Sequence, residues 1–339
     1  DEGGGGGGED RFQVAAFSIP RGPAGRRGAE FELRAPTTAR NAMRVLRALQ
    51  LPKPVLLEGS PGVGKSSLVS ALAKAAGHHL VRINLSEQTD MMDLLGADLP
   101  SEGGAPGDFR WSDGVLLRAI KHGSWVLLDE LNLASQSILE GLNAILDHRA
   151  EVFIPELGQV FKCPPTFRVF SAQNPLQEGG GRKGLPKSFL NRFTQVHVEL
   201  LQEEDLLFIL QALHPRVPTP ALGRMVAVNA ALHDAAMVKR TLAQAGAPWE
   251  FNLRDLMRWC ELAEDAVAPA PGSAASQEVR AADGGAVARQ VVRFAPLLYI
   301  QRMRTREDRV KVGALLEELL GESCPGPPAP GVALAPGGG

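Results

Sequence analysis

The chain has 339 residues, of which 44% are hydrophobic and 22% charged, and its formal net charge is −2. This size and composition favour a globular chain with a large core and room for two structural units. With 5% aromatic residues and no overall basic field, the composition disfavours nucleic-acid partners, so we expect no direct sequence-specific nucleic-acid binding.

The cysteine and apolar patterns argue against a disulfide-rich secreted protein and against a membrane protein. Cys163, Cys260 and Cys324 lie far apart and form neither a metal pattern nor a disulfide framework, so we expect a reducing compartment. No apolar stretch approaches the roughly 18 residues that span a bilayer, and the acidic start is not typical of a secretory signal. We therefore expect no membrane segment.

Both ends of the chain are of low complexity. Residues 1–30 begin acidic and glycine-rich, residues 322–339 are mostly Pro, Gly and Ala, and both are predicted to be disordered tails. Because the chain starts at Asp1 without a methionine, we expect it to be a segment of something longer, although a processed chain would look the same.

Apolar periodicity then predicts strands that alternate with helices. A helix with apolar positions at Ala42, Val45 and Leu46 follows the pair Thr37-Thr38, which can cap it. Strands are expected over 54–57, 80–85, 124–128, 167–172 and 195–200, and further helices over 68–75, 116–121 and 135–146. Such alternation is typical of a parallel, doubly wound sheet, so the predicted fold class is an α/β domain over residues 31–201.

Two segments interrupt the alternation of strands and helices. A second structural unit follows the α/β domain. Residues 96–111 are rich in Gly and Pro and predict an inserted loop or hairpin, while residues 151–161 alternate around a glycine and predict a hairpin. Residues 202–321 carry helix formers at helical spacing and predict a smaller helical domain. Within it, residues 266–285 are expected to be a flexible insertion.

The clearest chemical signal is a phosphate-binding loop between the first core strand and its helix. Its spacing is G-x-x-x-x-G-K-S, in which glycines let backbone N–H groups curl around a polyphosphate at a helix N-terminus. The predicted nucleotide contacts are Gly59, Ser60, Pro61, Gly62, Val63, Gly64, Lys65, Ser66 and Ser67. Lys65 is expected on the β- and γ-phosphates and Ser66 on Mg²⁺, so ATP and Mg²⁺ are the predicted cofactors.

A second signal is the acid pair that ends the apolar strand over 124–128. Open parallel sheets bind ligands at the carboxyl ends of their strands. Asp129 is therefore expected to join Ser66 at Mg²⁺, and Glu130 to orient and deprotonate an attacking water. The simpler interpretation is a strand followed by a polar turn. The phosphate-binding loop elsewhere in the sequence makes this interpretation less favoured.

Two further residues are catalytic candidates. Asn174 follows a predicted strand and could hold the lytic water or a γ-phosphate oxygen, although Asn-Pro is also a turn signal. Arg192 lies between apolar anchors and could neutralise charge on a transferring phosphoryl group. We expect Arg192 to serve a neighbouring ATP site; the alternative is a surface arginine that caps a helix.

In the helical unit, Arg254 is a candidate nucleotide contact. Asn252 is predicted to cap a helix that places Arg254 in its first turn, where positive charge opposes the helix dipole. A γ-phosphate contact would explain this position, and a salt bridge to Asp255 or a nearby acid would explain it equally well.

Taken in order, these residues resemble the site residues of AAA+ ATPases. In that family the matching positions are Walker A (Lys65, Ser66), Walker B (Asp129, Glu130), sensor 1 (Asn174), the arginine finger (Arg192) and sensor 2 (Arg254). The resemblance covers about residues 31–321 and implies a P-loop sheet flanked by helices, a helical lid and ATP hydrolase activity. The two irregular segments, 96–111 and 151–161, resemble the helix-2-insert branch, which includes MoxR-type chaperones, magnesium chelatase and dynein.

Longer strings are similar to giant dynein-like members of this branch that act in maturation of the large ribosomal subunit. These strings lie at 33–38, 56–65, 82–90, 129–134 and 179–186. The resemblance implies a ring of six modules in one chain, in which Arg192 serves an adjacent module. It also implies a nuclear location and, as partners, pre-60S particles and their assembly factors. The low-complexity ends and the 266–285 insertion depart from the family pattern, and a lone module should be a poor ATPase.

Three other functions remain open at this point. The module could bind nucleotide to hold a ring together with little turnover, or it could be another MoxR-like chaperone. A nucleic-acid motor would rest only on Arg182, Lys183 and the basic run over 302–311, which is more simply a solvated helix face.

Overall fold

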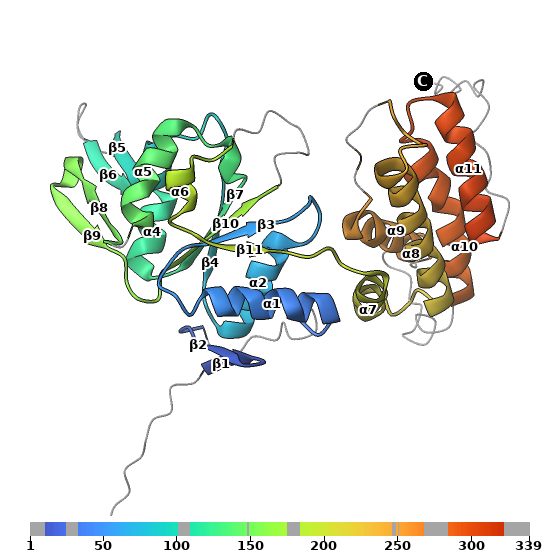
Figure 1. Cartoon of the computed structure of the whole chain (residues 1–339), viewed down its shortest axis with the longest axis horizontal. Coiled ribbons are helices and arrows are strands. Elements are labelled where there is room, and N and C mark those ends of the chain that lie inside the picture. Colours follow the sequence, from blue (N-terminus) through green and yellow to red (C-terminus); the bar gives the residue numbers. More distant parts are fainter. Residues whose placement is uncertain are drawn as a thin grey trace, which may run out of the picture. The chain divides into compact units, whose positions relative to one another are not determined.

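A computed structural model describes residues 11–24, 33–100, 109–147, 149–174, 184–245, 249, 251–267 and 284–321. The chain divides into two compact units, Asp1–Leu200 and Leu201–Gly339, which are described separately (Figure 1). Among the described residues, none of the helices has both the length and the apolar character needed to cross a bilayer.

The first unit is built on a five-stranded sheet. All neighbouring strands are parallel, in the order β11-β3-β10-β7-β4, which confirms the predicted α/β fold. The strands are β3 (Val55–Glu58), β4 (Leu80–Asn84), β7 (Trp125–Asp129), β10 (Arg168–Gln173) and β11 (Thr194–His197). Because non-consecutive strands pair, β3 and β7 lie on either side of β10, and their carboxyl ends share one edge.

Helices cover both faces of this sheet (Figure 1). Side chains along β3 alternate between two cores: Val55 and Leu57 pack against α1 and α2, whereas Leu56 packs on the opposite face. The opposite face is covered by α3, α4, α5 and α6. The bounds are α1 (Pro36–Ala48), α2 (Lys65–Ala76), α3 (Met91–Leu95), α4 (Val115–His122), α5 (Gln136–Leu146) and α6 (Lys187–Leu190), with a 3₁₀ turn, η1 (Leu131–Leu133).

Two antiparallel hairpins extend this unit where the sequence predicts them. The first pairs β5 (Gly96–Pro100) with β6 (Phe109–Asp113), and residues 101–108 between them lie outside the described part. The second pairs β8 (Glu151–Ile154) with β9 (Gln159–Lys162) around a short turn, η2 (Pro155–Leu157), that ends at Gly158 with φ 59°. In the β8–β9 hairpin Val152 and Ile154 are buried while Phe153 and Val160 are exposed, so this hairpin buries one face; no residue of β5 or β6 is fully buried.

The expectation of a disordered tail over residues 1–30 is wrong for residues 11–24. These form a third hairpin, β1 (Arg11–Val14) with β2 (Phe17–Pro20), whose Phe12 and Ile19 are buried in the core beside α1 and α2. Alternating apolar residues on either side of a two-residue turn supply a buried face, which outweighs the low complexity of the flanking glycines. Residues 1–10 and 25–30 lie outside the described residues.

The start of α1 also differs from the prediction. The helix begins at Pro36 after Ala35, which makes no side-chain capping bond. Thr37 lies inside the helix, 1% exposed, and its hydroxyl accepts a hydrogen bond from Arg40 at 2.9 Å. Proline at the first helical position has no N–H that needs a cap, and the helix starts two residues earlier than a cap at Thr37 would place it.

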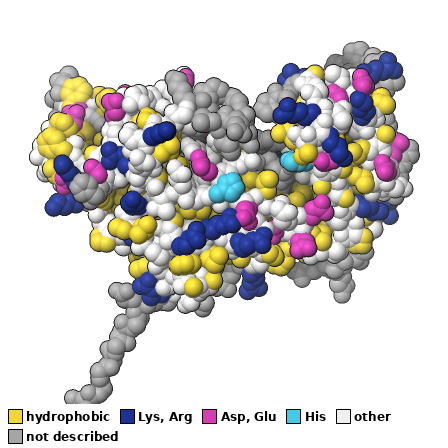
Figure 2. All heavy atoms as spheres, viewed as in Figure 1, with side chains coloured by type: hydrophobic (Ala, Val, Ile, Leu, Met, Phe, Trp, Pro, Cys, Tyr) yellow, Lys and Arg dark blue, Asp and Glu magenta, His cyan; other side chains and the backbone are white. Residues whose placement is uncertain are grey.

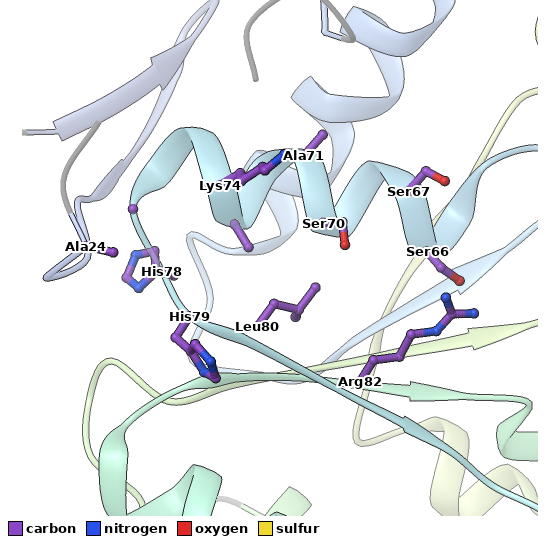
Figure 3. Close-up of a pocket in the computed structure, with 12 residues that line it drawn as sticks. Ala24, Ser66, Ser67, Ser70, Ala71, Lys74, His78, His79, Leu80 and Arg82 are labelled. Carbon is purple, nitrogen blue, oxygen red and sulfur yellow. The ribbon is translucent and has the colours of Figure 1, made fainter. Parts of the chain in front are cut away.

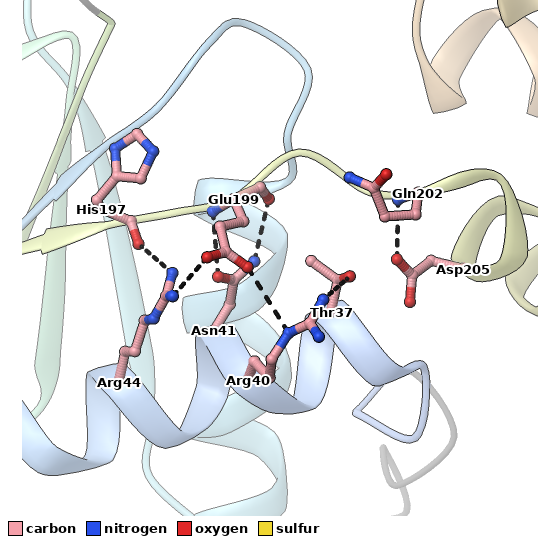
Figure 4. A network of polar contacts seen from close by, with 8 residues as sticks. All are labelled: Thr37, Arg40, Asn41, Arg44, His197, Glu199, Gln202 and Asp205. Carbon is pink, nitrogen blue, oxygen red and sulfur yellow. Dashed lines mark hydrogen bonds and ion pairs between the residues drawn. The ribbon is translucent and has the colours of Figure 1, made fainter.

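Helix α1 is tied to the end of β11 by a polar network, the α1–β11 clasp (Figure 4). Asn41 donates to the Glu199 carbonyl and accepts from the Glu199 N–H, both at 3.1 Å. Arg44 donates to the His197 carbonyl at 3.2 Å and to the Glu199 carboxylate at 2.5 Å. The Arg44 hydrogen bond lowers the pKa of Glu199. Figure 2 shows Lys and Arg side chains gathered in a row over α1.

The second unit is helical, as predicted. It comprises α7 (Glu203–Leu213), α8 (Thr219–His233), α9 (Leu253–Asp265), α10 (Gly284–Ala295) and α11 (Arg306–Leu320), with π-helical turns η4 (Asp234–Val238) and η5 (Pro296–Ile300). Its core centres on Trp259 and Tyr299, whose rings meet edge to face at 5.3 Å. Of the expected flexible insertion over 266–285, Gly284 and Gly285 instead open α10, and residues 268–283 lie outside the described part, as do 322–339.

Candidate nucleotide-binding site

The loop between β3 and α2 has the shape that a phosphate-binding loop requires. Gly62 and Gly64 adopt left-handed conformations with φ of 78° and 83°, which a residue with a side chain rarely adopts. A Cβ atom at Gly64 would meet nothing within 4 Å, so open space faces this point of the loop. Helix α2 begins directly after it at Lys65. The loop therefore presents its backbone to a space at a helix N-terminus, as an anion site does.

Lys65 is held at the centre of this loop. The side chain is buried, with 8% of the residue exposed. Its Nζ donates to the carbonyls of Gly59 at 2.6 Å and Ser60 at 3.0 Å, and to Asn174 Oδ1 at 2.7 Å. A buried ammonium surrounded by neutral oxygens favours the arrival of a negatively charged group.

Ser66 and Asp129 meet across the sheet edge. Ser66 Oγ donates to Asp129 Oδ2 at 3.0 Å, although the two residues come from α2 and the end of β7. Magnesium prefers hard oxygen ligands at about 2.1 Å in octahedral geometry, in which neighbouring ligands lie about 3 Å apart. These two oxygens therefore fit neighbouring positions of a Mg²⁺ shell. Among the described residues no group of three or more His, Cys, Asp or Glu could hold a metal.

Glu130 follows Asp129 with an unusual backbone. It adopts the left-handed conformation, φ 57° and ψ 40°, which costs a non-glycine residue of order 1–3 kcal/mol. Its Oε2 atom is buried and has no hydrogen-bond partner in the described part of the chain. A buried carboxylate oxygen without a partner is the kind of atom that an ordered water or substrate completes.

The strand register brings Asn174 to the same place. Gln173 lies opposite Glu58 in the β10–β3 pair, and its side chain also donates to the Glu58 carboxylate. In the β10–β7 pair, Ala172 lies opposite Asp129. The next residue, Asn174, thus emerges between the phosphate-binding loop and the acid pair, where it contacts Lys65. The structure brings Lys65, Ser66, Asp129, Glu130 and Asn174 together at one sheet edge.

Arg82 is a neighbour that the sequence analysis missed. It lies on β4, and its Nε donates to Asp129 Oδ2 at 3.0 Å while Nη2 makes a second, shorter contact with the same oxygen. The signal available in the sequence was a single arginine in the apolar strand predicted over 80–85. Periodicity assigns such a residue to the solvent side of an edge strand and does not show how far its side chain reaches.

Beside this edge, a cavity of about 520 Å³ runs between α2 and β4 (Figure 3). Ser66 and Arg82 lie at one end of it, and His78 and Ala24 lie at the other. Lys74 and His79 also contribute to its lining, in which the described residues include no Asp or Glu.

Arg192 lies just after α6, away from the contacts of Lys65. Its Nη1 pairs with Asp147 Oδ1 at 3.4 Å, and 30% of its side chain is exposed. Its Nε is buried without a hydrogen-bond partner in the described part of the chain. The structure thus holds the guanidinium at the surface of the first unit by one long ion pair.

Arg254 belongs to the second unit, in the first turn of α9. Asn252 caps this helix as predicted, by accepting from the Arg254 N–H at 3.0 Å. Asp255 pairs with Arg302 at 3.1 Å, and among the described residues no ion pair joins it to Arg254, which was one alternative.

Some of the basic residues considered for nucleic acid make ion pairs within the helical unit, and others lie outside the described residues. Arg302 pairs with Asp255, and Lys311 pairs with Glu307 one helical turn away at 2.7 Å. Arg182 and Lys183 lie outside the described residues.

A phosphate-binding loop on a parallel sheet with this strand order, followed by a helical unit, defines a P-loop NTPase domain with a lid. Comparisons with known proteins agree. Residues 54–193 match the model of the AAA domain (dynein-related subfamily), and residues 205–323 match that of the midasin AAA lid domain. The chain therefore belongs to the AAA ATPases of the dynein-related subfamily, as one AAA module of the midasin kind.

Relatives support this assignment over most of the chain. Midasin of Dictyostelium discoideum is 55% identical over 304 residues, which is 90% of this chain and 5% of that protein. Midasin of Giardia intestinalis is 46% identical over 90% of this chain and 6% of its own length. An uncharacterized Staphylococcus aureus protein is 27% identical, over 62% of this chain and 78% of its own length. The chain thus spans only a small part of the midasins that it matches.

Proposed function

We propose that this module binds ATP with Mg²⁺ and hydrolyses it, and that turnover drives movement within a ring of such modules. The proposal rests mainly on the way three segments meet at one sheet edge: the loop with the start of α2, the end of β7 and the end of β10. Lys65 lies 2.7 Å from Asn174, and Ser66 lies 3.0 Å from Asp129, although these pairs come from separate elements. A structural turn or a solvated loop would need no such convergence.

Nucleotide binding falls to the loop and to the start of α2. Backbone N–H groups and the helix dipole favour a polyphosphate there, and Lys65 supplies a buried positive charge to it. The proposed contacts are Gly59, Ser60, Pro61, Gly62, Val63, Gly64, Lys65, Ser66 and Ser67. Ser66 Oγ and Asp129 would hold Mg²⁺, which when bound neutralises charge on the phosphate oxygens.

Hydrolysis falls to two groups at the ends of β7 and β10. Glu130 has a buried carboxylate oxygen without a partner in the described chain, so it is free to accept a proton from a water. Asn174 supplies an amide that would donate toward the γ-phosphate or the water once a phosphate oxygen has taken its place at Lys65. A general base typically contributes about 10²–10⁴ in rate.

Arginines complete the site from elsewhere. Arg192 is only loosely paired, with Asp147 at 3.4 Å, so little is lost when the guanidinium turns to the nucleotide of an adjacent module. Arg254 is proposed as the contact from the helical unit, residues 202–321, acting as a lid on the nucleotide-binding unit, residues 31–201.

We also propose, from the family resemblance, that the ring acts on pre-60S ribosomal particles and releases their assembly factors in the nucleus. The similarity to midasins over 90% of the chain supports this role. Because the chain spans 5–6% of those proteins, the role belongs to the whole assembly and not to this module alone.

The test is ATP turnover of the full-length protein with this module intact or carrying Glu130→Gln. Loss of the base should reduce the turnover contributed by this module about 10²–10⁴-fold while ATP binding is kept. Glu140→Gln, on the exposed side of α5, is the matched control and should leave turnover unchanged. Equal turnover in wild type and Glu130→Gln would contradict hydrolysis here and favour a nucleotide-sensing module.

A further inference from the structure

The position of Arg82 gives Asp129 a positive partner of its own. Two guanidinium donors, Nε at 3.0 Å and the closer Nη2, reach the same oxygen, Oδ2, that accepts the Ser66 hydroxyl. In Figure 3 the Arg82 guanidinium points from β4 toward Ser66 at the start of α2. The oxygen proposed for Mg²⁺ is therefore already occupied by three donors.

The two ends of this ion pair differ in their exposure. The Asp129 side chain is 14% exposed, so removal of its positive partner would leave a largely desolvated carboxylate. The Arg82 side chain is 54% exposed, so it can leave for water at little cost. The pair is thus anchored at Asp129 and can open at Arg82.

We propose that Arg82 is a built-in counter-cation of Asp129 that competes with Mg²⁺ for this carboxylate and so sets how much Mg²⁺ the module needs to bind nucleotide. The inference rests on the proposed function. Arg82 neutralises Asp129 while the site is empty and withdraws when Mg²⁺ arrives with the nucleotide, because two cations on one oxygen repel each other. It acts as a positioning residue through Asp129.

The fold provides room for this withdrawal. Ser66 and Arg82 line one end of the cavity of about 520 Å³ between α2 and β4, so there is free volume beside the guanidinium for its withdrawal. Among the described residues no acid lines the cavity, so none of them offers the withdrawn guanidinium a second carboxylate there. The balance between Arg82 and Mg²⁺ is therefore decided at Asp129.

Competition between Arg82 and Mg²⁺ predicts how the Mg²⁺ requirement changes when Arg82 is removed. An exposed ion pair competes only weakly, and contact with a largely desolvated carboxylate strengthens the competition. Removal of Arg82 should therefore lower the Mg²⁺ concentration at half-maximal nucleotide binding by about threefold to tenfold. If instead Arg82 contacted the phosphates as its main role, its removal would weaken nucleotide binding at every Mg²⁺ concentration.

The test is a Mg²⁺ titration at a fixed concentration of a fluorescent, non-hydrolysable ATP analogue, with binding followed by fluorescence of the analogue. Wild type is compared with Arg82→Gln, Arg82→Lys and the control Arg110→Gln, an exposed arginine on β6. The proposal expects the lowest midpoint for Arg82→Gln, an intermediate one for Arg82→Lys and the wild-type value for the control. Arg82→Lys keeps the positive charge beside Asp129. If Arg82→Gln does not fold, the comparison of Arg82→Lys with wild type still tests the proposal.

The possible results separate this inference from the proposed function. An unchanged or raised midpoint in both Arg82 variants, with normal binding at saturating Mg²⁺, overturns the role of Arg82 alone. Failure of folded wild-type protein to bind the analogue at any Mg²⁺ concentration overturns the nucleotide site itself, and this inference with it.

Discussion

Lys65 Nζ lies 2.7 Å from Asn174 Oδ1, and this hydrogen bond joins the phosphate-binding loop to the end of β10. The Gly59 and Ser60 carbonyls lie within 3.0 Å of the same nitrogen. An ammonium has three N–H donors, so a phosphate oxygen that binds Lys65 must take the place of one of these partners. Asn174 is the partner on another strand, and release of its side chain would couple nucleotide binding to β10.

Substitution of Asn174 should therefore separate binding from catalysis. In Asn174→Ala, Lys65 keeps its loop carbonyls and loses a competitor for phosphate, so the Kd for Mg-ATP should change by less than about threefold. Turnover by this module in the assembled protein should fall about 10²–10³-fold, as on removal of one positioned donor. Calorimetry gives the first quantity and phosphate release the second. A large loss of affinity with normal turnover would contradict this role.

Arg192 should matter only where a neighbouring module is present. Arg192→Ala should leave nucleotide affinity of the isolated module unchanged and should lower turnover of the assembled protein at the adjacent site by about 10³–10⁵-fold. Arg149→Ala, an exposed arginine in the same unit, is the control. The measurement is single-site turnover with the other sites inactivated. Equal activity of Arg192→Ala and its control would show that the arginine merely pairs with Asp147.

The α1–β11 clasp should contribute to the stability of the first unit. Asn41 is 2% exposed and satisfies both the N–H and the C=O of Glu199. Asn41→Ala leaves these backbone groups without that partner, which should lower the free energy of unfolding by about 1–3 kcal/mol. Urea unfolding measures the change, with Arg47→Ala on the exposed side of α1 as the control. Matching midpoints for both variants would rule out a stabilising role.

Asp308 should make the second unit sensitive to acid. Hydrogen bonds from Thr305 and from the Ala243 N–H hold the pKa of Asp308 below its usual value. A lowered carboxyl pKa contributes stability above the unfolded pKa, near 4, and this contribution is lost as pH falls through the folded pKa. Thermal unfolding of Asp308→Asn should therefore show less loss of stability below pH 4 than wild type. Parallel pH profiles would contradict this account.

The sequence was most informative where residues with a chemical role directly follow a predicted strand. The loop ending in Lys65 and the acids Asp129 and Glu130 could be placed because glycine spacing and an apolar run each identify a strand end. Parallel topology then implies that these ends meet. Asn174 could be placed only by assuming the strand order, which the structure confirms.

The parts that the sequence did not predict depend on contacts between distant residues. The hairpin over 11–20 was hidden by glycine-rich flanks, because composition describes a segment and not the surface that covers it. Arg82 reaches Asp129, 47 positions away, only because β4 and β7 are neighbours in the sheet. Likewise, the pairing of Arg192 with Asp147 depends on how α6 packs beside α5.

The most direct test of the central claim is calorimetric titration of the folded chain with Mg-ATP, for wild type and Lys65→Ala. The account predicts saturable binding by wild type, with affinity lowered about 10–100-fold in Lys65→Ala and unchanged in Lys74→Ala, a lysine on the exposed side of the same helix. Circular dichroism confirms that each variant is folded. Absence of binding by folded wild type, or equal binding by wild type and Lys65→Ala, would contradict the nucleotide site.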